Sequence, residues 1–376
     1  MRKTAAVLAA WMILVSPAPA RPAAADARPA RALFVSVIQD PPVLSGRDAI
    51  DGLVRYAVRA GVRTLFVQIY RENKAWFRST VGDSSPYEAC LASVGEDPLA
   101  LLIRQAHASG IEVHAWLNLL SLGANEHSPL LGRYGTDILT RNVYEKKTLD
   151  SYKIDNQFFL DPGDERVREA LSRVVGEVVD AYPELDGLQF DYIRYPDWHP
   201  AYGYNSRNVA RYLEKVGRDM IPIENDDPSW QQWKRDQVTG LLELLAGEAR
   251  SRKPSLRIST TGLVPYSRAN LEAFQDWRTW LDRGLVDFVT LMGYSTSTIR
   301  FRRYLRDARD SGPADGLARI NVAVGAYEMT RQPRTFRRQI EACREAGPRA
   351  CVAFHYGSLM ENPELAATFA GDGEKS

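Results

Sequence analysis

The chain has 376 residues, of which 45% are hydrophobic and 25% are charged. This composition is typical of a globular protein, and the length suits one large barrel domain or two average domains. The 48 Lys and Arg residues nearly balance the 47 Asp and Glu residues. The sequence therefore has neither the basic excess expected of a nucleic-acid-binding protein nor a long basic run that favours an anionic membrane.

Residues 1–25 have the pattern of a secretory signal peptide. Two basic residues precede a short apolar run at 5–15, and Ala-rich cleavage sites follow it. The run is too short to span a bilayer comfortably, although an uncleaved anchor is the alternative. We expect the mature chain to begin between Arg21 and Asp26. Its first segment is a linker that ends at residue 31. The protein is then secreted or periplasmic, with no stable membrane insertion after the signal is removed.

Export would place the three cysteines in an oxidising compartment. Cys343 and Cys351 flank a Gly-Pro turn and could form a disulfide, which would leave Cys90 over. Three buried thiols are equally compatible with this count.

From residue 32 to about residue 370, short β-branched or aromatic runs alternate with helical stretches. Gly or Pro marks the turns that lead from helix into strand. Eight such units predict a parallel sheet closed into a single-domain (β/α)8 TIM barrel of the α/β class. The expected strands are 32–38, 64–70, 112–118, 187–191, 257–261, 288–294, 321–326 and 351–356.

The connections from strand into helix include two long segments, 119–163 and 192–227. In a barrel these connections share one rim, which carries the active site, and long connections in compact domains are usually functional. The residues that end the strands are therefore the candidates for chemistry.

The strand at 187–191 holds the main candidate. Period-two alternation puts Gln189 and Asp191 on one side of the strand, and Asp191 ends it. An acidic residue in an apolar strand needs a partner or a function. Arg194 is close enough in sequence to be a charge partner that keeps Asp191 ionised. A buried Asp191–Arg194 ion pair without catalytic role is the alternative.

Other rim residues suit a sugar, whose rings stack on aromatic side chains and whose hydroxyls need donors and acceptors. His114, Trp116 and Asn118 share one face of their strand, and Gln68 and Tyr70 alternate on another. His114 is expected to bind or orient rather than to catalyse. The predicted substrate-binding residues are Arg194, His114, Trp116, Asn118, Gln68, Tyr70, Gln189, Tyr192, Tyr294, Tyr327 and Tyr356.

Glycoside hydrolysis normally requires a second carboxyl group. Glu328 and Glu72 follow strand ends on the expected rim and rank first, ahead of Glu126 and Asp161. The five histidines form no metal-binding pattern, and no nucleophile elbow or dinucleotide fingerprint occurs. We therefore expect no metal and no cofactor.

These segments resemble the glycosyl-hydrolase-like family ten proteins. The resemblance rests on residues 159–163 and 186–196, and extends to 114–118, 233–236 and 287–294. It implies a (β/α)8 barrel that acts on glycans, with Asp191 as catalytic carboxylate. Some members are similar to enzymes that cut peptidoglycan strands stripped of their peptides. The chain departs from the family at Leu119, where a Pro is usual, and at Arg194, where many members carry an aromatic residue.

The strand at 187–191 also resembles the catalytic strand of chitinases. Gln189 replaces the middle Asp of that motif, and no Glu follows Asp191, so a substrate-assisted mechanism is not expected. The sequence predicts an O-glycosyl hydrolase, a monomer, that cleaves a cell-wall or extracellular polysaccharide, with peptidoglycan strands favoured. A non-catalytic glycan-binding barrel is the alternative.

Overall fold

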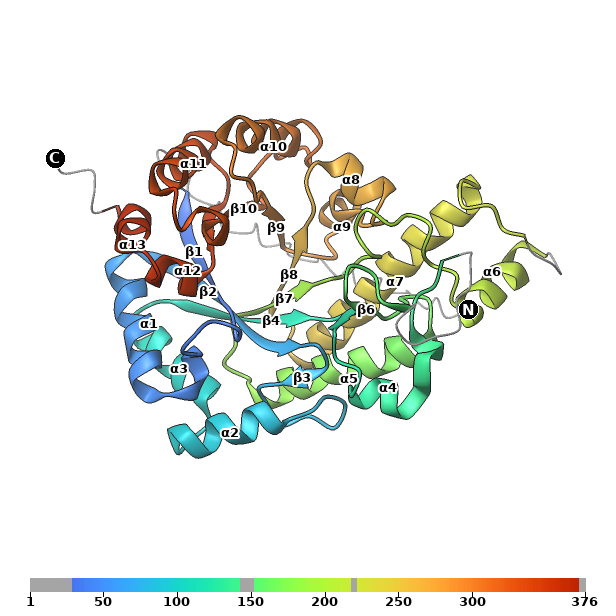
Figure 1. Ribbon diagram of the computed structural model, residues 1–376, viewed down its shortest axis with the longest axis horizontal. Helices are drawn as coiled ribbons and strands as arrows, with labels where there is room; N and C mark the ends of the chain where they lie inside the picture. Colours follow the sequence, from blue (N-terminus) through green and yellow to red (C-terminus); the bar gives the residue numbers. More distant parts are fainter. Residues whose placement is uncertain (1–28, 143–151, 218–221, 372–376) are drawn as a thin grey trace, which may run out of the picture.

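The structure is a computed structural model and describes residues 29–142, 152–217 and 222–371. The predicted signal peptide at 1–25 lies outside the described residues. Eight parallel strands form a closed barrel in the order β1-β11-β10-β9-β8-β7-β4-β2, and β1 pairs with β2 to close it (Figure 1). These strands are β1 Ala30–Val35, β2 Val62–Arg71, β4 Glu112–Asn118, β7 Gly187–Asp191, β8 Arg257–Gly262, β9 Phe288–Met292, β10 Ile320–Gly325 and β11 Ala350–Phe354.

Helices surround the barrel in Figure 1 and alternate with the strands along the chain. Their bounds are α1 Arg47–Arg59, α2 Ser85–Val94, α3 Pro98–Ala108, α4 Pro129–Tyr134, α5 Glu165–Ala181, α6 Ser206–Val216, α7 Pro228–Arg252, α8 Tyr266–Leu271, α9 Trp277–Asp282, α10 Thr298–Asp310, α11 Pro333–Ala346, α12 Tyr356–Met360 and α13 Pro363–Ala370. None of the helices in these ranges is long and apolar enough to cross a membrane.

The predicted (β/α)8 barrel is confirmed, and each of its eight strands forms close to the expected bounds. The first strand begins at Ala30, so the end of the predicted linker belongs to the barrel. Backbone pairing explains this, because Ala30 and Arg31 are already in register with β11. The guanidinium of Arg31 also donates to the carbonyl oxygens of Ala60, at 2.8 Å, and Ala370, at 3.2 Å. Those bonds tie the first strand to the ends of α1 and α13.

Strand register brings the candidate residues to one rim. Asn118 and Asp191 are direct partners in the β4–β7 pair, which confirms that both lie at the carboxyl end of the barrel. The barrel interior is a small aromatic and aliphatic cluster that includes Phe34, Phe66 and Trp116. A much larger cluster fills the layer between the strands and the helices. The interior is therefore packed, and the open part of the barrel is its rim.

The long connections add further elements on the rim side. β3 Lys74–Ala75 pairs with the end of β2, and β5 Ser121–Gly123 pairs with β6 Phe158–Phe159. Short 3-10 helices add Val43–Ser45, Gly135–Ile138 and Ala326–Met329. Cys343 of α11 and Cys351 of β11 form a disulfide, and Cys90 is a buried free cysteine. Of the two alternatives that the sequence left open, the structure contains the disulfide.

Candidate active site

Asp191 lies at the barrel mouth and is 5% exposed. Trp116 Nε1 donates to its Oδ2 at 3.0 Å, and the Tyr192 amide donates to its Oδ1 at 2.8 Å. The Thr261 hydroxyl donates to the same Oδ1. All three neighbours are donors, so both oxygens of an ionised carboxylate are satisfied. The donors come from β4, β8 and the backbone that follows β7, and they fix the direction in which the carboxylate points.

Arg194 does not pair with Asp191, contrary to the expectation from sequence. Its guanidinium carbon lies 4.6 Å from the centre of the Tyr192 ring, and its Nη1 donates to the Tyr195 carbonyl at 3.3 Å. Arg194 takes part in no ion pair among the described residues. Among the described residues, the contacts of the Asp191 carboxylate are therefore the three hydrogen bonds and no ion pair.

A chain of amide and hydroxyl groups runs beside Asp191. Gln68 Nε2 donates to Asn118 Oδ1 at 2.9 Å. Gln68 Oε1 accepts from the Ser36 hydroxyl at 2.9 Å and from the Val37 amide at 3.2 Å. Both amide side chains are buried, so this network fixes the orientation of Asn118 at the rim. The structure thus brings the predicted residues Gln68, Trp116 and Asn118 into one group around Asp191.

An aromatic wall forms one side of the mouth. The rings of Tyr294 and Phe354 have centroids 5.0 Å apart, and Tyr327 lies 5.6 Å from Tyr294. Phe354 also contacts Trp116, with centroids 5.8 Å apart. Tyr327 is 44% exposed, so the wall begins at the surface and descends toward Asp191. Such a surface suits the apolar face of a sugar ring.

Asp191 and the candidate glutamates affect the pKa values of the same tyrosines. Burial, and next the Asp191 charge, raises the pKa of the Tyr294 hydroxyl well above its ordinary value, and Glu328 acts in the same direction. Burial raises the pKa of Tyr192, with Asp191 and Glu72 adding to the rise and Arg194 opposing it. Each candidate glutamate therefore shares a tyrosine neighbour with Asp191. Both phenols stay neutral and remain donors at physiological pH.

The two candidate glutamates differ in their surroundings. Glu328 is half-buried in the 3-10 turn after β10 and accepts a hydrogen bond from the Tyr327 hydroxyl at 3.1 Å. Glu72 forms an ion pair with Arg71, whose Nη2 lies 2.9 Å from its Oε1. A paired cation favours the ionised form of a carboxyl group. Glu328 is therefore the better candidate for a proton donor.

The backbone is strained at two of these positions. Glu72 has φ 57° and Tyr192 has φ 57°, in the left-handed region that non-glycine residues rarely adopt. Each such residue costs about 1–3 kcal/mol, and strained residues cluster at functional sites. The left-handed residue Tyr192 is also the one whose amide donates to Asp191 Oδ1. At Glu72 the side chain lies over Gly123, where any Cβ would collide with its carboxyl group.

The structure places four predicted substrate-binding residues away from the mouth. His114 and Gln189 point into the barrel below the rim, and both are fully buried. His114 is level with the first residue of β7 and packs against Phe66 and Phe288. Burial, helped by nearby arginines, lowers its pKa well below the ordinary value, so it is neutral. Alternation along a strand gives the side of the sheet but not the depth in the barrel.

Tyr70 and Tyr356 lie outside the barrel interior. A register shift between Gln68 and Tyr70 turns Tyr70 outward, where Asn73 donates to its hydroxyl at 2.8 Å. The Tyr356 ring packs against Tyr56 of α1, with centroids 5.7 Å apart. A bulge residue moves every side chain after it to the opposite face of the sheet. The alternating pattern of the sequence does not show where such a bulge lies.

Two contributing residues were missed from the sequence. Thr261 is the last inward-pointing residue of β8, and its hydroxyl donates to Asp191. Its position near the end of a strand could have identified it from the sequence. Phe354 supplies the aromatic ring expected from Tyr356. In the loop after β7, Trp198 is 63% exposed, whereas Tyr195 is buried and belongs to the packing of the loop.

Glu126 and Asp161, the lower-ranked carboxylates, do not join the mouth group. Glu126 pairs with Lys153 at 2.6 Å, and Asp161 is fully buried. Within the part of the chain that the structure describes, no group of three or more metal-ligating side chains is present.

Comparison with known sequences places the chain in a family. The profile of the glycosyl hydrolase-like 10 family matches residues 46–327. Glycosyl hydrolase DigH of Escherichia coli K12 is 25% identical over 255 residues, which cover 61% of this chain and 54% of DigH. Glycosyl hydrolase YngK of Bacillus subtilis is 25% identical over 251 residues, which cover 61% of this chain and 46% of YngK. The chain spans about half the length of these curated relatives.

Solved structures share the fold at low sequence identity. The glycoside hydrolase domain of PgaB (BpsB) from Bordetella bronchiseptica superposes with a TM-score of 0.67 and 16% identity, covering 91% of this chain and 97% of that domain. Alpha-L-fucosidase isoenzyme 2 from Paenibacillus thiaminolyticus gives a TM-score of 0.59 and 15% identity, covering 92% of this chain and 49% of the fucosidase. The structural likeness shows a common barrel, and the profile match extends over most of the chain. The protein therefore belongs to the glycosyl hydrolase-like 10 family.

Proposed function

We propose that the protein hydrolyses O-glycosidic bonds in a cell-wall or extracellular polysaccharide, with peptidoglycan glycan strands as the favoured substrate. The observation that carries the proposal is the buried Asp191 carboxylate, held by three donors at the mouth of a barrel beside an aromatic wall. Family membership supports glycoside hydrolysis. The peptide-free peptidoglycan strand is suggested by the family resemblance of the sequence.

In this proposal Asp191 acts as the nucleophile or the general base. Asp191 is the acceptor in all three of its hydrogen bonds, an arrangement that suits a nucleophile or base rather than a proton donor. Glu328 acts as general acid and protonates the leaving oxygen, since Glu72 is paired with Arg71. A separation of about 5 Å between the two carboxyl groups in the substrate complex would indicate retention, and about 6.5–9.5 Å inversion.

The sugar would be held by the groups around Asp191. The exposed Tyr327 and the ring of Tyr294 offer a stacking surface, and Asn118 offers amide hydrogen bonds. Arg194 would help to hold the sugar with its guanidinium group, which lies over the Tyr192 ring. We also propose that the protein works in the periplasm or the medium, to which the disulfide between Cys343 and Cys351 is suited.

The test is incubation of the protein with purified peptidoglycan, intact and freed of peptides, together with a panel of neutral polysaccharides. Mass spectrometry of the soluble products identifies any cleaved bond. We expect fragments from the peptide-free strand. Release only from another polysaccharide would change the substrate, and binding without any product would support a non-catalytic glycan-binding barrel.

A further inference from the structure

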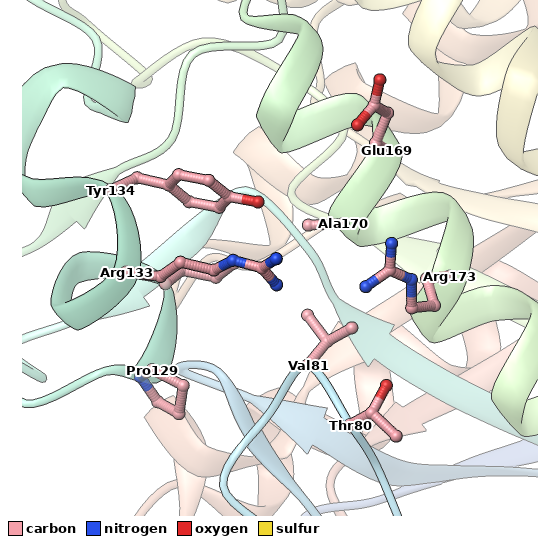
Figure 2. A pocket seen from close by; sticks show the side chains of 9 residues that line it. Thr80, Val81, Pro129, Arg133, Tyr134, Glu169, Ala170 and Arg173 are labelled. Atoms are coloured by element: carbon pink, nitrogen blue, oxygen red, sulfur yellow. The ribbon is translucent and has the colours of Figure 1, made fainter.

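A small hollow lies outside the barrel, where α4 and α5 meet the loop after β3. Its volume is about 70 Å³. The buried side chains of Val81, Leu130 and Ala170 give it an apolar floor. Figure 2 shows that Arg133 of α4 and Arg173 of α5 extend into the same space from opposite sides, with the Tyr134 hydroxyl beside them. Nothing in the proposed reaction uses these residues.

Within the described ranges, neither arginine has an anionic partner. The guanidinium of Arg133 lies 5.3 Å from the centre of the Tyr134 ring, and Arg166 lies 5.5 Å from the same ring. No ion pair or hydrogen bond among the described residues engages the side chain of Arg133 or Arg173. Glu169 lines the hollow, but Figure 2 shows its carboxylate at the edge, away from both guanidinium groups. Two cations that face one hollow repel each other unless an anion lies between them.

The chemistry of the hollow selects a class of ligand. A guanidinium group presents paired donors that match a carboxylate or phosphate, and the Tyr134 hydroxyl adds another donor. The apolar floor favours a ligand that carries carbon next to its charge. Because one water needs about 10–15 Å³ of such a volume, the hollow holds a group of a few heavy atoms, not a disaccharide.

We propose that this hollow binds a carboxylate group carried on a short carbon frame, with Arg133 and Arg173 as its two cationic contacts. The carboxylate belongs either to a free small acid or to an acid side group of a larger saccharide. The site does not depend on the proposed glycosidase activity, because none of its residues lies at the barrel mouth.

The site is nevertheless connected to the rim. Asn73 Oδ1 accepts from the Leu130 amide at 3.0 Å, and Asn73 Nδ2 donates to the Val81 carbonyl at 3.3 Å. Asn73 follows Glu72 directly in the chain and is itself left-handed, with φ 58°. The floor of the hollow and the Glu72 turn therefore form one hydrogen-bonded unit.

The test is calorimetric titration of the full chain at low ionic strength with four probes. These are lactate, N-acetylmuramate, the neutral N-acetylglucosamine and inorganic phosphate. We expect one or both acids to bind. Arg133→Gln and Arg173→Gln should each weaken binding by about tenfold, because each removes charge-assisted hydrogen bonds. Glu169→Gln removes a repulsive charge and should tighten binding. Arg303→Gln, an exposed change on α10, serves as the matched control and should leave affinity unchanged.

The outcomes separate the sources and decide the proposal. Binding of lactate supports a free acid, and binding of N-acetylmuramate without lactate supports an acid group on a saccharide. Equal affinity for N-acetylglucosamine or for phosphate overturns the assignment to carboxylates. Unchanged affinity in the Arg133→Gln/Arg173→Gln double variant, shown by circular dichroism to be folded, overturns the site.

Discussion

Two buried aspartates on the rim side of the barrel differ in their hydrogen-bond donors. Asp191 accepts from Trp116, Thr261 and the Tyr192 amide. Asp161, which follows β6, accepts from the Gly163 amide at 2.8 Å and more weakly from the Tyr195 hydroxyl at 3.4 Å. Its Oδ2 has no hydrogen-bond partner among the described residues. Hydrogen bonds from the protein replace the lost water around the first carboxylate. Around the second they replace it only in part, so its charged form is costly to bury.

The consequence for Asp161 is a preference for the protonated form. Burial raises the pKa of Asp161 to about 7. Burial also lowers the pKa of nearby Lys234 to about 7, and its ammonium donates to the Pro200 carbonyl at 2.7 Å. A nucleophile or base must be ionised, whereas a structural carboxyl group can keep its proton. The number of donors, more than burial itself, therefore separates the catalytic candidate from the structural one.

The largest expected effect is that of Asp191→Asn. Asparagine has nearly the same shape but cannot act as nucleophile or base, so kcat should fall by at least about a hundredfold. The melting temperature should also fall, because the asparagine NH2 replaces one acceptor oxygen and meets a donor such as Trp116 Nε1; no ion pair with Arg194 is lost. Activity and thermal unfolding are measured together, with Glu126→Gln as a surface control. Full activity in the Asp191→Asn protein would remove this residue from the mechanism.

Glu328→Gln tests the assignment of the acid. Cleavage of the natural glycan should fall by about a hundredfold, since the leaving oxygen is no longer protonated. An aryl glycoside whose leaving group needs no proton should be affected much less. Glu72→Gln is the matched control, and it should show no such dependence on the leaving group. If Glu72→Gln alone shows that dependence, the acid is Glu72.

Thr261→Val sharpens the argument from donors. Valine keeps the shape of threonine but removes the hydroxyl that donates to Asp191 Oδ1. A hydrogen bond to a charged group contributes about 1.5–3 kcal/mol, so we expect kcat/KM to fall by about ten- to a hundredfold. Thr260→Val is the control, because the Thr260 hydroxyl donates to the Thr261 carbonyl instead of the carboxylate. Equal losses in both variants would show a packing effect rather than a role at Asp191.

The sequence predicted the barrel because the eight strand patterns and their turns are local signals. It also predicted that Asp191 lies at the rim, since a lone carboxylate at the end of an apolar strand is conspicuous. It did not predict the pairing of Arg194, because proximity in sequence does not determine where a long side chain points. The depth of His114 and the bulge before Tyr70 depend on barrel register, which contacts between distant strands determine.

The smallest expected effect concerns Asp161→Asn and appears in stability rather than activity. Folded Asp161 keeps its proton up to about pH 7, whereas an unfolded Asp releases it near pH 3.9. Between about pH 4 and 7 the folded state binds more protons, so Asp161 makes the unfolding free energy fall as pH rises, by at most about 1.4 kcal/mol per pH unit. Lys234 acts oppositely and above pH 7: an unfolded Lys holds its proton to about pH 10.4, so this group makes stability rise there. Urea unfolding at pH 5, 6, 7 and 8 should therefore show a weaker decline between pH 5 and 7 in Asp161→Asn than in the unchanged protein. Asp191→Asn should keep the decline, and identical profiles for all three proteins would show that Asp161 is ionised in the folded state.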